Sequence, residues 1–133
     1  MFTRKGRSLQ SKRFVTGMLS YYNIRRDDMA DFVQAQIKGD QVVVFLKPSC
    51  PYCVLAKDVL SKYSFKSGHL NFVDISGRDD MGAIQDYLQN VTGARTVPRV
   101  FIGGECIGGG SDVQGLDNSG KLKGMLQKIG ALQ

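Results

Sequence analysis

The chain contains no tryptophan, one histidine and three cysteines among its 133 residues. Three cysteines, two of them in a close pair, are too few for the disulfide framework of a small secreted domain, and they indicate a reducing compartment. A structural zinc site needs four ligands, and the sequence offers neither a second cysteine pair nor a histidine pair. No apolar run approaches the roughly 18 residues of a membrane-spanning helix. We therefore expect one globular domain with no bound metal and no membrane partner.

Positive charge is concentrated at the beginning of the chain. The formal net charge is +6, but residues 1–28 carry seven Lys or Arg against two Asp, whereas residues 29–133 carry eleven against ten acids. The basic character therefore belongs to the first segment and does not indicate a nucleic-acid partner for the rest. We expect residues 1–28 to be a basic N-terminal extension and residues 29–133 to form the folded domain.

Three interpretations of residues 1–28 remain open. The segment can be a disordered extension or an upstream start, with Met29 as the natural initiator, which implies a cytoplasmic protein. Its composition, rich in Arg and Ser with no acid before Asp27, also fits a mitochondrial transit peptide. The third interpretation is an arm that binds membrane or nucleic acid.

From Met29 onward, apolar residues recur with the periods of helices and strands. The run 42–46 is fully apolar, which predicts a central strand buried on both faces. A helical pattern over 51–63 leads to a strand near 70–75, which should be parallel to the first because a helix connects them. A helix that ends at Thr92-Gly93 follows, and then a hairpin turning at Gly103-Gly104. With helices at both ends, the order α-β-α-β-α-β-β-α resembles the thioredoxin-like α/β arrangement, a four-stranded mixed sheet with helices on both faces.

Two cysteines in C-x-x-C spacing, Cys50-Pro51-Tyr52-Cys53, lie where the first strand passes into a helix. Backbone N–H groups and the helix dipole favour a thiolate at that point, and Lys47 adds a nearby positive charge. We therefore expect Cys50 to be the nucleophile. Cys53, one turn later and more buried, is the expected resolving thiol. Two incidental buried thiols are the alternative.

Thr96-Val97-Pro98 precedes the third predicted strand. In thioredoxin-like folds a proline at this place is commonly cis. A cis bond would place the Val97 backbone beside the Cys50 sulfur, where it can pair with an extended substrate. An ordinary trans proline at the start of a strand fits the spacing equally well.

The run Gly108-Gly109-Gly110-Ser111-Asp112 precedes a short predicted helix that Ser111 can cap. Glycines let a ligand approach closely, and the helix start offers N–H donors for a carboxylate. Asp112 offers an acceptor for an ammonium group, and glutathione carries both groups. Gly-rich turns before helices are common, so this run carries weight only beside the other two motifs.

In this order, the three motifs resemble the dithiol glutaredoxins, particularly those of the vertebrate cytosol, over residues 29–133. The resemblance implies a thioredoxin-like fold and glutathione as co-substrate, with Cys50 and Cys53 catalytic. The glutathione-binding residues that it implies are Lys47, Tyr52, Gln85, Thr96, Val97, Pro98, Gly109, Ser111 and Asp112. Of these, Lys47 and Gln85 would hold the glycyl carboxylate, Val97 would pair with the cysteinyl backbone, and Ser111 and Asp112 would hold the γ-glutamyl end. Arg95 is a further neighbour of the site.

The sequence departs from this family at one position that bears on thiol chemistry. Gly110 stands where similar vertebrate proteins often carry a further cysteine, so we expect no accessory thiol reaction there and unchanged core chemistry. The remaining thiol, Cys106, is expected to be half-buried and inert. A site of regulatory glutathionylation or of dimerisation is the alternative for Cys106.

The resemblance implies a monomer that reduces protein–glutathione mixed disulfides and protein disulfides at the expense of glutathione. Two other functions are compatible with a C-x-x-C pair in this fold. A thioredoxin, reduced by a flavoenzyme, usually has Trp before the motif and Gly-Pro inside it, and this chain has neither. A dimer that shares an iron–sulfur cluster through Cys50 and glutathione usually has Ser or Gly after the first cysteine, and Pro51 argues against it.

Overall fold

The computed structural model describes residues 29–133, so the predicted basic extension lies outside the described residues. Four strands form one sheet in the order β2-β1-β3-β4. Their bounds are Val42–Leu46 for β1, Leu70–Asp74 for β2, Arg99–Ile102 for β3 and Glu105–Gly108 for β4. β1 is parallel to β2 and antiparallel to β3, which is antiparallel to β4. The predicted mixed sheet, its parallel pair and its hairpin are confirmed.

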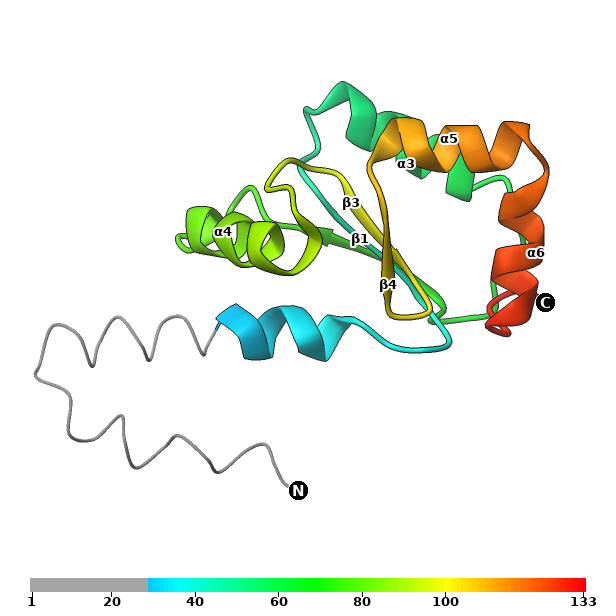
Figure 1. Ribbon diagram of the computed structural model, residues 1–133, viewed down its shortest axis with the longest axis horizontal. Helices are drawn as coiled ribbons and strands as arrows, with labels where there is room; N and C mark the ends of the chain where they lie inside the picture. Colours follow the sequence, from blue (N-terminus) through cyan, green and yellow to red (C-terminus); the bar gives the residue numbers. More distant parts are fainter. Residues whose placement is uncertain (1–28) are drawn as a thin grey trace, which may run out of the picture.

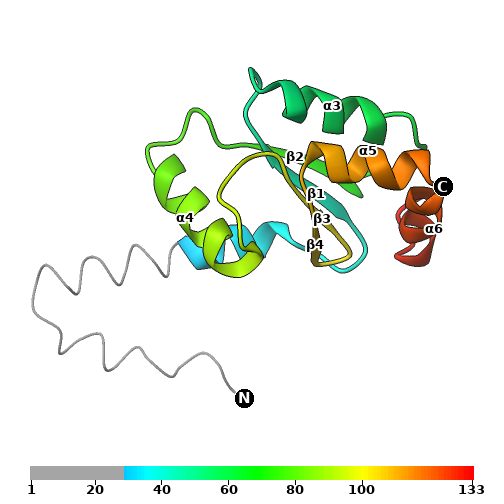
Figure 2. The same ribbon diagram turned by 45° about the horizontal axis from the view of Figure 1, so that its top comes forward.

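Helices cover both faces of this sheet. They are α3 (Pro51–Leu60), α4 (Met81–Thr92), α5 (Gly110–Asn118) and α6 (Lys121–Lys128), and residues 29–36 are also helical. In Figure 1, α3, α5 and α6 lie on one side of the sheet, and α4 and the helical residues 29–36 lie on the other. The turned view in Figure 2 shows α5 alongside α3 again. The predicted layers are confirmed.

The core consists of two apolar layers because successive strand residues point to opposite faces. Val42, Val44 and Leu46 pack toward α3, α5 and α6. Val43 and Phe45 pack toward α4 and residues 29–36. All of β1 is buried, as the uninterrupted apolar run predicts, and this rigid central strand leads directly to the cysteine pair.

Helix α3 ends at Leu60, before the predicted end at residue 63. After that point the chain tightens into turns, in which the N–H groups of Lys62 and Tyr63 donate to carbonyls three residues back, those of Val59 and Leu60. Such tightening is common at helix ends. Helix α4 ends as predicted at Gly93, whose φ of 87° is in the left-handed region that favours glycine.

Candidate active site

Cys50 lies at the junction of β1 and α3 and is the N-cap residue of the helix. Its Sγ accepts a hydrogen bond from the backbone N–H of Cys53 at 3.3 Å. Pro51 follows in the first turn, where its missing N–H would have had no partner within the helix. Cys50 is partly exposed, whereas Cys53 is only 1% exposed. A substrate can therefore reach the first sulfur but not the second, and the predicted burial of Cys53 is confirmed.

The surroundings of Cys50 favour its thiolate. Burial acts to raise the pKa of Cys50, but hydrogen bonds from the Cys53 thiol and from the N–H groups of Cys53 and Tyr52 outweigh it, so that the pKa is lowered. The positive charge of Lys47 acts in the same direction and is the weakest of these influences. The donors of the first helical turn, more than Lys47, therefore stabilise the anion.

The pKa of the second thiol, Cys53, is shifted in the opposite direction. Burial raises the pKa of Cys53 to about 12, and the hydrogen bond and negative charge at Cys50 add to the effect. The backbone N–H of Lys47, which donates to Cys53 Sγ at 3.5 Å, opposes it. When the pair loses one proton, the negative charge therefore lies on Cys50 and the remaining proton on Cys53.

The loop before β3 brings a backbone carbonyl to the reactive sulfur. The Val97–Pro98 peptide bond is cis, which decides between the two isomers that the spacing allowed. The Cys50 sulfur lies 3.6 Å from the carbonyl oxygen of Val97, to which it donates when it is protonated. Pro98 is buried, Val97 is half-buried and Thr96 is exposed. The expectation that a cis bond places the Val97 backbone beside Cys50 is confirmed.

The first turn of α5 is capped differently from the sequence prediction. Gly109, not Ser111, is the N-cap residue, and the carboxylate of Asp112 accepts a hydrogen bond from the Gly109 N–H at 2.8 Å. The predicted cap was wrong because Asp112 stands three residues after Gly109, the spacing at which an acidic side chain reaches back to the N-cap. Ser111 instead lies inside the first turn, and both it and Asp112 are exposed.

The remaining predicted residues lie at different depths. Tyr52 is 59% exposed beside the pair, and Lys47 is partly exposed. Gln85 is buried on α4, and its Nε2 donates to the carbonyl of Arg95 at 3.0 Å. Gln85 is thus joined to the loop that leads to the cis proline. Arg95 itself is exposed, and its guanidinium lies 3.2 Å from the carboxylate of Asp86.

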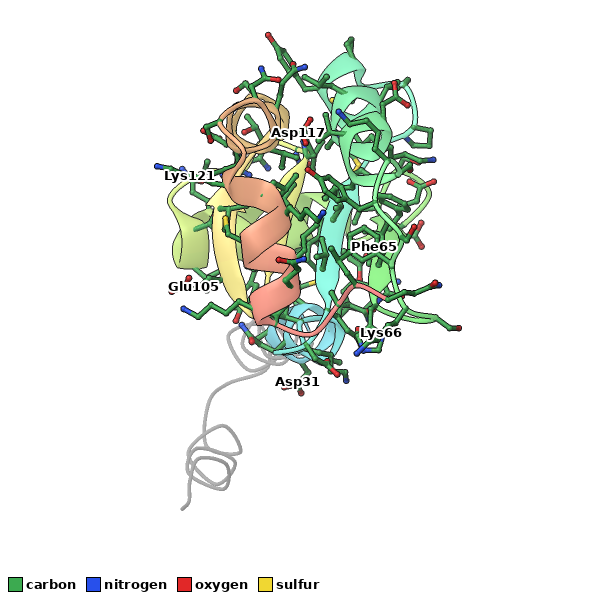
Figure 3. The ribbon with its side chains drawn as sticks, turned by 90° about the vertical axis from the view of Figure 1, so that its right-hand side faces the viewer. Asp31, Phe65, Lys66, Glu105, Asp117 and Lys121 are labelled. Carbon is green, nitrogen blue, oxygen red and sulfur yellow. The ribbon has the colours of Figure 1, made fainter. Side chains whose placement is uncertain are left out.

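Helices α3 and α5 lie side by side and run in the same direction. Their first turns meet at Gly110 and the backbone of Tyr52. Near its other end, α5 is joined to the turns that follow α3, because Asp117 accepts from Lys62 Nζ at 2.6 Å and from the Tyr63 hydroxyl. Figure 3 shows Asp117 between the two helices. The two helix N-termini therefore lie next to each other, an arrangement that favours an anionic ligand.

Sequence reasoning did not find these helix contacts. The sequence places Gly110 in a run that lets a ligand approach and at the position of a family cysteine, although a glycine at a helix start is also a sign of close packing. No signal in the sequence connects Asp117 with Lys62, which lies 55 positions earlier. Cys106, by contrast, is half-buried as predicted, and it packs on the face of the sheet opposite Cys50.

Nowhere in residues 29–133 do three or more His, Cys, Asp or Glu side chains gather as metal ligands. None of the helices described there is long and apolar enough to cross a membrane.

Known proteins are similar to this chain in both sequence and fold. The family model for Glutaredoxin matches residues 42–107. Glutaredoxin-1 of Homo sapiens is 55% identical over 103 residues, which are 77% of this chain and 97% of that protein. An oxidized glutaredoxin 2 of Chlamydomonas reinhardtii superimposes with a TM-score of 0.74 at 38% identity, covering 80% of this chain and 98% of that one.

A glutaredoxin–glutathione complex from buckwheat has the same TM-score of 0.74 at 33% identity, covering 81% of this chain and 96% of that one. The sheet order and helix layers thus have the thioredoxin-like form expected of residues 29–133. The family and the fold are those of a glutathione-dependent thiol oxidoreductase, and Cys50 and Cys53 lie close together at the start of α3. On sequence and structure alike, the chain belongs to the glutaredoxin family.

Proposed function

We propose that the protein reduces protein–glutathione mixed disulfides through Cys50 and reduces protein disulfides through Cys50 together with Cys53. The observation that carries this proposal is the contrast between the thiols. The partly exposed Cys50 has a lowered pKa, whereas the buried Cys53 has a pKa raised to about 12. The thiolate is the attacking species in disulfide exchange, so the exposed sulfur is the one prepared to react.

In the first reaction, the Cys50 thiolate attacks the glutathione sulfur of a mixed disulfide. A bond forms between Cys50 and that sulfur, and the protein substrate leaves as a thiolate that takes up a proton. The thiolate of a second glutathione then attacks the glutathione sulfur on Cys50. Oxidised glutathione leaves, and the Cys50 thiolate is restored.

In the second reaction, the Cys50 thiolate attacks one sulfur of a protein disulfide and becomes joined to it, while the S–S bond breaks and the other sulfur leaves as a thiolate that takes up a proton. Forming this bond removes the negative charge of Cys50, which is one of the influences that raise the pKa of Cys53. Cys53 then loses its proton more readily, attacks Cys50, and expels the substrate as a thiol. Two glutathione molecules reduce the resulting Cys50–Cys53 disulfide and leave as oxidised glutathione.

Glutathione is proposed to lie across the two helix starts and the cis-proline loop. Its cysteinyl backbone would pair with Val97, whose carbonyl lies 3.6 Å from Cys50 Sγ. Its γ-glutamyl end would meet Ser111 and Asp112 at the exposed first turn of α5. Tyr52, Thr96, Pro98 and Gly109 would line the remaining surface.

The glycyl carboxylate of glutathione is assigned to Lys47 and Gln85. The Gln85 amide already donates to the Arg95 carbonyl, and an amide nitrogen carries two hydrogens, so one remains for a carboxylate. The cytoplasmic location and the monomeric state inferred from the sequence stay predictions.

Substitution of each cysteine tests the proposal. We expect Cys50→Ser to abolish turnover of a glutathionylated protein and of a protein disulfide, in an assay coupled to glutathione reductase. Cys53→Ser should keep the first activity and lose the second. If Cys50→Ser retained turnover of the glutathionylated protein, the nucleophile would be wrongly assigned. Turnover driven by thioredoxin reductase but not by glutathione would point to a thioredoxin instead.

A further inference from the structure

A side chain at position 108 would collide with the carboxylate of Asp112. A Cβ atom built on Gly108 would overlap Oδ2 of Asp112 and lie 2.6 Å from its carboxyl carbon. Carbon atoms that are not bonded stay about 3.5 Å apart or more, so the two groups cannot both keep these places. Because an aspartate carboxylate can turn about its side-chain bonds, it would be displaced before the backbone of α5.

The Asp112 carboxylate is held in place by one of its two oxygens. Oδ2 accepts a hydrogen bond from the backbone N–H of Gly109 at 2.8 Å. No other residue in the described range 29–133 forms a hydrogen bond or ion pair with this carboxylate, and Asp112 is exposed. The carboxylate is therefore fixed through Oδ2, while Oδ1 remains available to a ligand.

Gly108 differs from a glycine that is needed only for its backbone conformation. The φ of Gly108 is 117° and that of Gly104 is 92°, both in the region that favours glycine. A Cβ atom built on Gly104, however, would meet nothing within 4 Å. The sequence predicts that the glycines of the 108–110 run make room for a ligand. At Gly108 that room is filled by a side chain of the same protein, Asp112.

A carboxylate that is already fixed binds a cationic group at lower cost than one that the ligand must first order. If a side chain at position 108 displaced Asp112 from the Gly109 N–H, the carboxylate would turn freely in solvent. An ammonium group would then have to order it on binding, whereas a ligand without an ammonium group would lose nothing. The displacement should therefore weaken the selection of ammonium-bearing ligands.

We propose that Gly108 is a specificity-determining position: its missing side chain lets Asp112 keep one oxygen on the Gly109 N–H and offer the other to the α-ammonium group of glutathione. The inference deepens the proposed function and rests on Asp112 meeting the γ-glutamyl end. It gives Gly108 a part in ligand selection through the space that it leaves for Asp112.

The test compares two mixed disulfides of thionitrobenzoate, one with glutathione and one with glutaryl-cysteinylglycine, which lacks only the α-ammonium group. The Cys50 thiolate attacks the tripeptide sulfur and forms a disulfide with it, while the original S–S bond breaks and thionitrobenzoate leaves as a coloured thiolate. The absorbance gives a rate constant for each compound, with reduced full-length protein in excess. The ratio of the two rate constants is the preference for the ammonium group.

We expect the unaltered protein to prefer the glutathione compound by about tenfold. Gly108→Ala should lower this preference by about three- to tenfold. Gly104→Ala is the matched control, because it places a side chain at a similar positive φ without a collision; it should keep the preference. Asp112→Ala should lose the preference by itself, and adding Gly108→Ala to it should lower the ratio no further.

A folded Gly108→Ala protein that keeps the preference would overturn the proposal, and so would an equal loss in Gly104→Ala or a further loss in the double variant. If Gly108→Ala does not fold, the double variant with Asp112→Ala decides, since it removes the collision. Restored folding would support the proposal, and continued failure to fold would refute it. An unaltered protein that reacts equally with both compounds would instead contradict the assignment of Asp112 to the γ-glutamyl end, so the two failures are distinguishable.

Discussion

Replacing the buried Cys53 by alanine should make the exposed Cys50 less reactive. The Cys53 thiol donates to Cys50 and is the strongest of the influences that lower the pKa of Cys50. Alanine removes this donor but keeps the backbone N–H that lies 3.3 Å from the sulfur. Serine keeps a donor at the same place. The two variants therefore separate the hydrogen bond from the presence of a second thiol.

The magnitude follows from the bond that is lost. Hydrogen bonds to charged groups contribute about 1.5–3 kcal/mol, and an S–H group is a weak donor. Because Cys50 is also partly exposed to solvent, we take about 1 kcal/mol, which corresponds to about a fivefold loss of thiolate below the pKa. Cys53→Ser should stay within about twofold of the unaltered protein, because its hydroxyl still donates.

The assay is the rate of alkylation against pH in a Cys106→Ser background, which leaves Cys50 as the only thiol in either variant. We expect the profile of Cys53→Ala to lie at higher pH than that of Cys53→Ser. Equal profiles would refute the reasoning, since the donated bond would then make no difference. A profile at lower pH for Cys53→Ala would refute the reasoning as well, because burial by Cys53, and not its hydrogen bond, would then determine the pKa of Cys50.

Two further predictions concern α5. Asp112→Asn keeps an acceptor for the Gly109 N–H but removes the charge, so we expect little change in the free energy of unfolding and a rise of about three- to tenfold in the KM for glutathione. Asp112→Ala should in addition lower the free energy of unfolding by about 1 kcal/mol, measured by chemical denaturation. An equal decrease in Asp112→Asn would contradict this. Separately, the hydrogen bond to Asp117 raises the pKa of Tyr63 to about 12, above the value near 10 of an unfolded chain. The contribution of this hydrogen bond to the free energy of unfolding is therefore complete below about pH 10 and is lost as the pH rises toward 12. Asp117→Asn should move the ultraviolet titration of Tyr63 to lower pH. An unchanged titration would show that the hydrogen bond does not hold the Tyr63 proton.

The fold was largely predictable because its signals are local. An uninterrupted apolar run can be satisfied only by a strand covered on both faces, and β1 is buried along its whole length. Gly103 and Gly104 have positive φ values of 62° and 92°, so the glycine pair marked the hairpin for a conformational reason. The cysteine pair was identifiable for a similar reason, since its chemistry depends on the helix start that directly follows the strand.

What could not be predicted depends on contacts between distant segments. The spacing of Val97-Pro98 fits either isomer, and the cis bond is seen only in the structure. The cap of α5 was misassigned because serine and glycine both suit a helix start, and Asp112 decided between them. Likewise, the meeting of Gly110 with Tyr52 exists only once α5 has docked on α3.

The account depends most on the negative charge of the pair being held by Cys50. The direct measurement is the pH titration of both cysteines in the reduced protein, followed by nuclear magnetic resonance of ¹³Cβ-labelled cysteine. We predict that Cys50 titrates below the ordinary range of a thiol and that Cys53 keeps its proton to about pH 12. A protein in which Cys53 ionises first, or in which Cys50 is still protonated above the ordinary thiol range, would contradict the account.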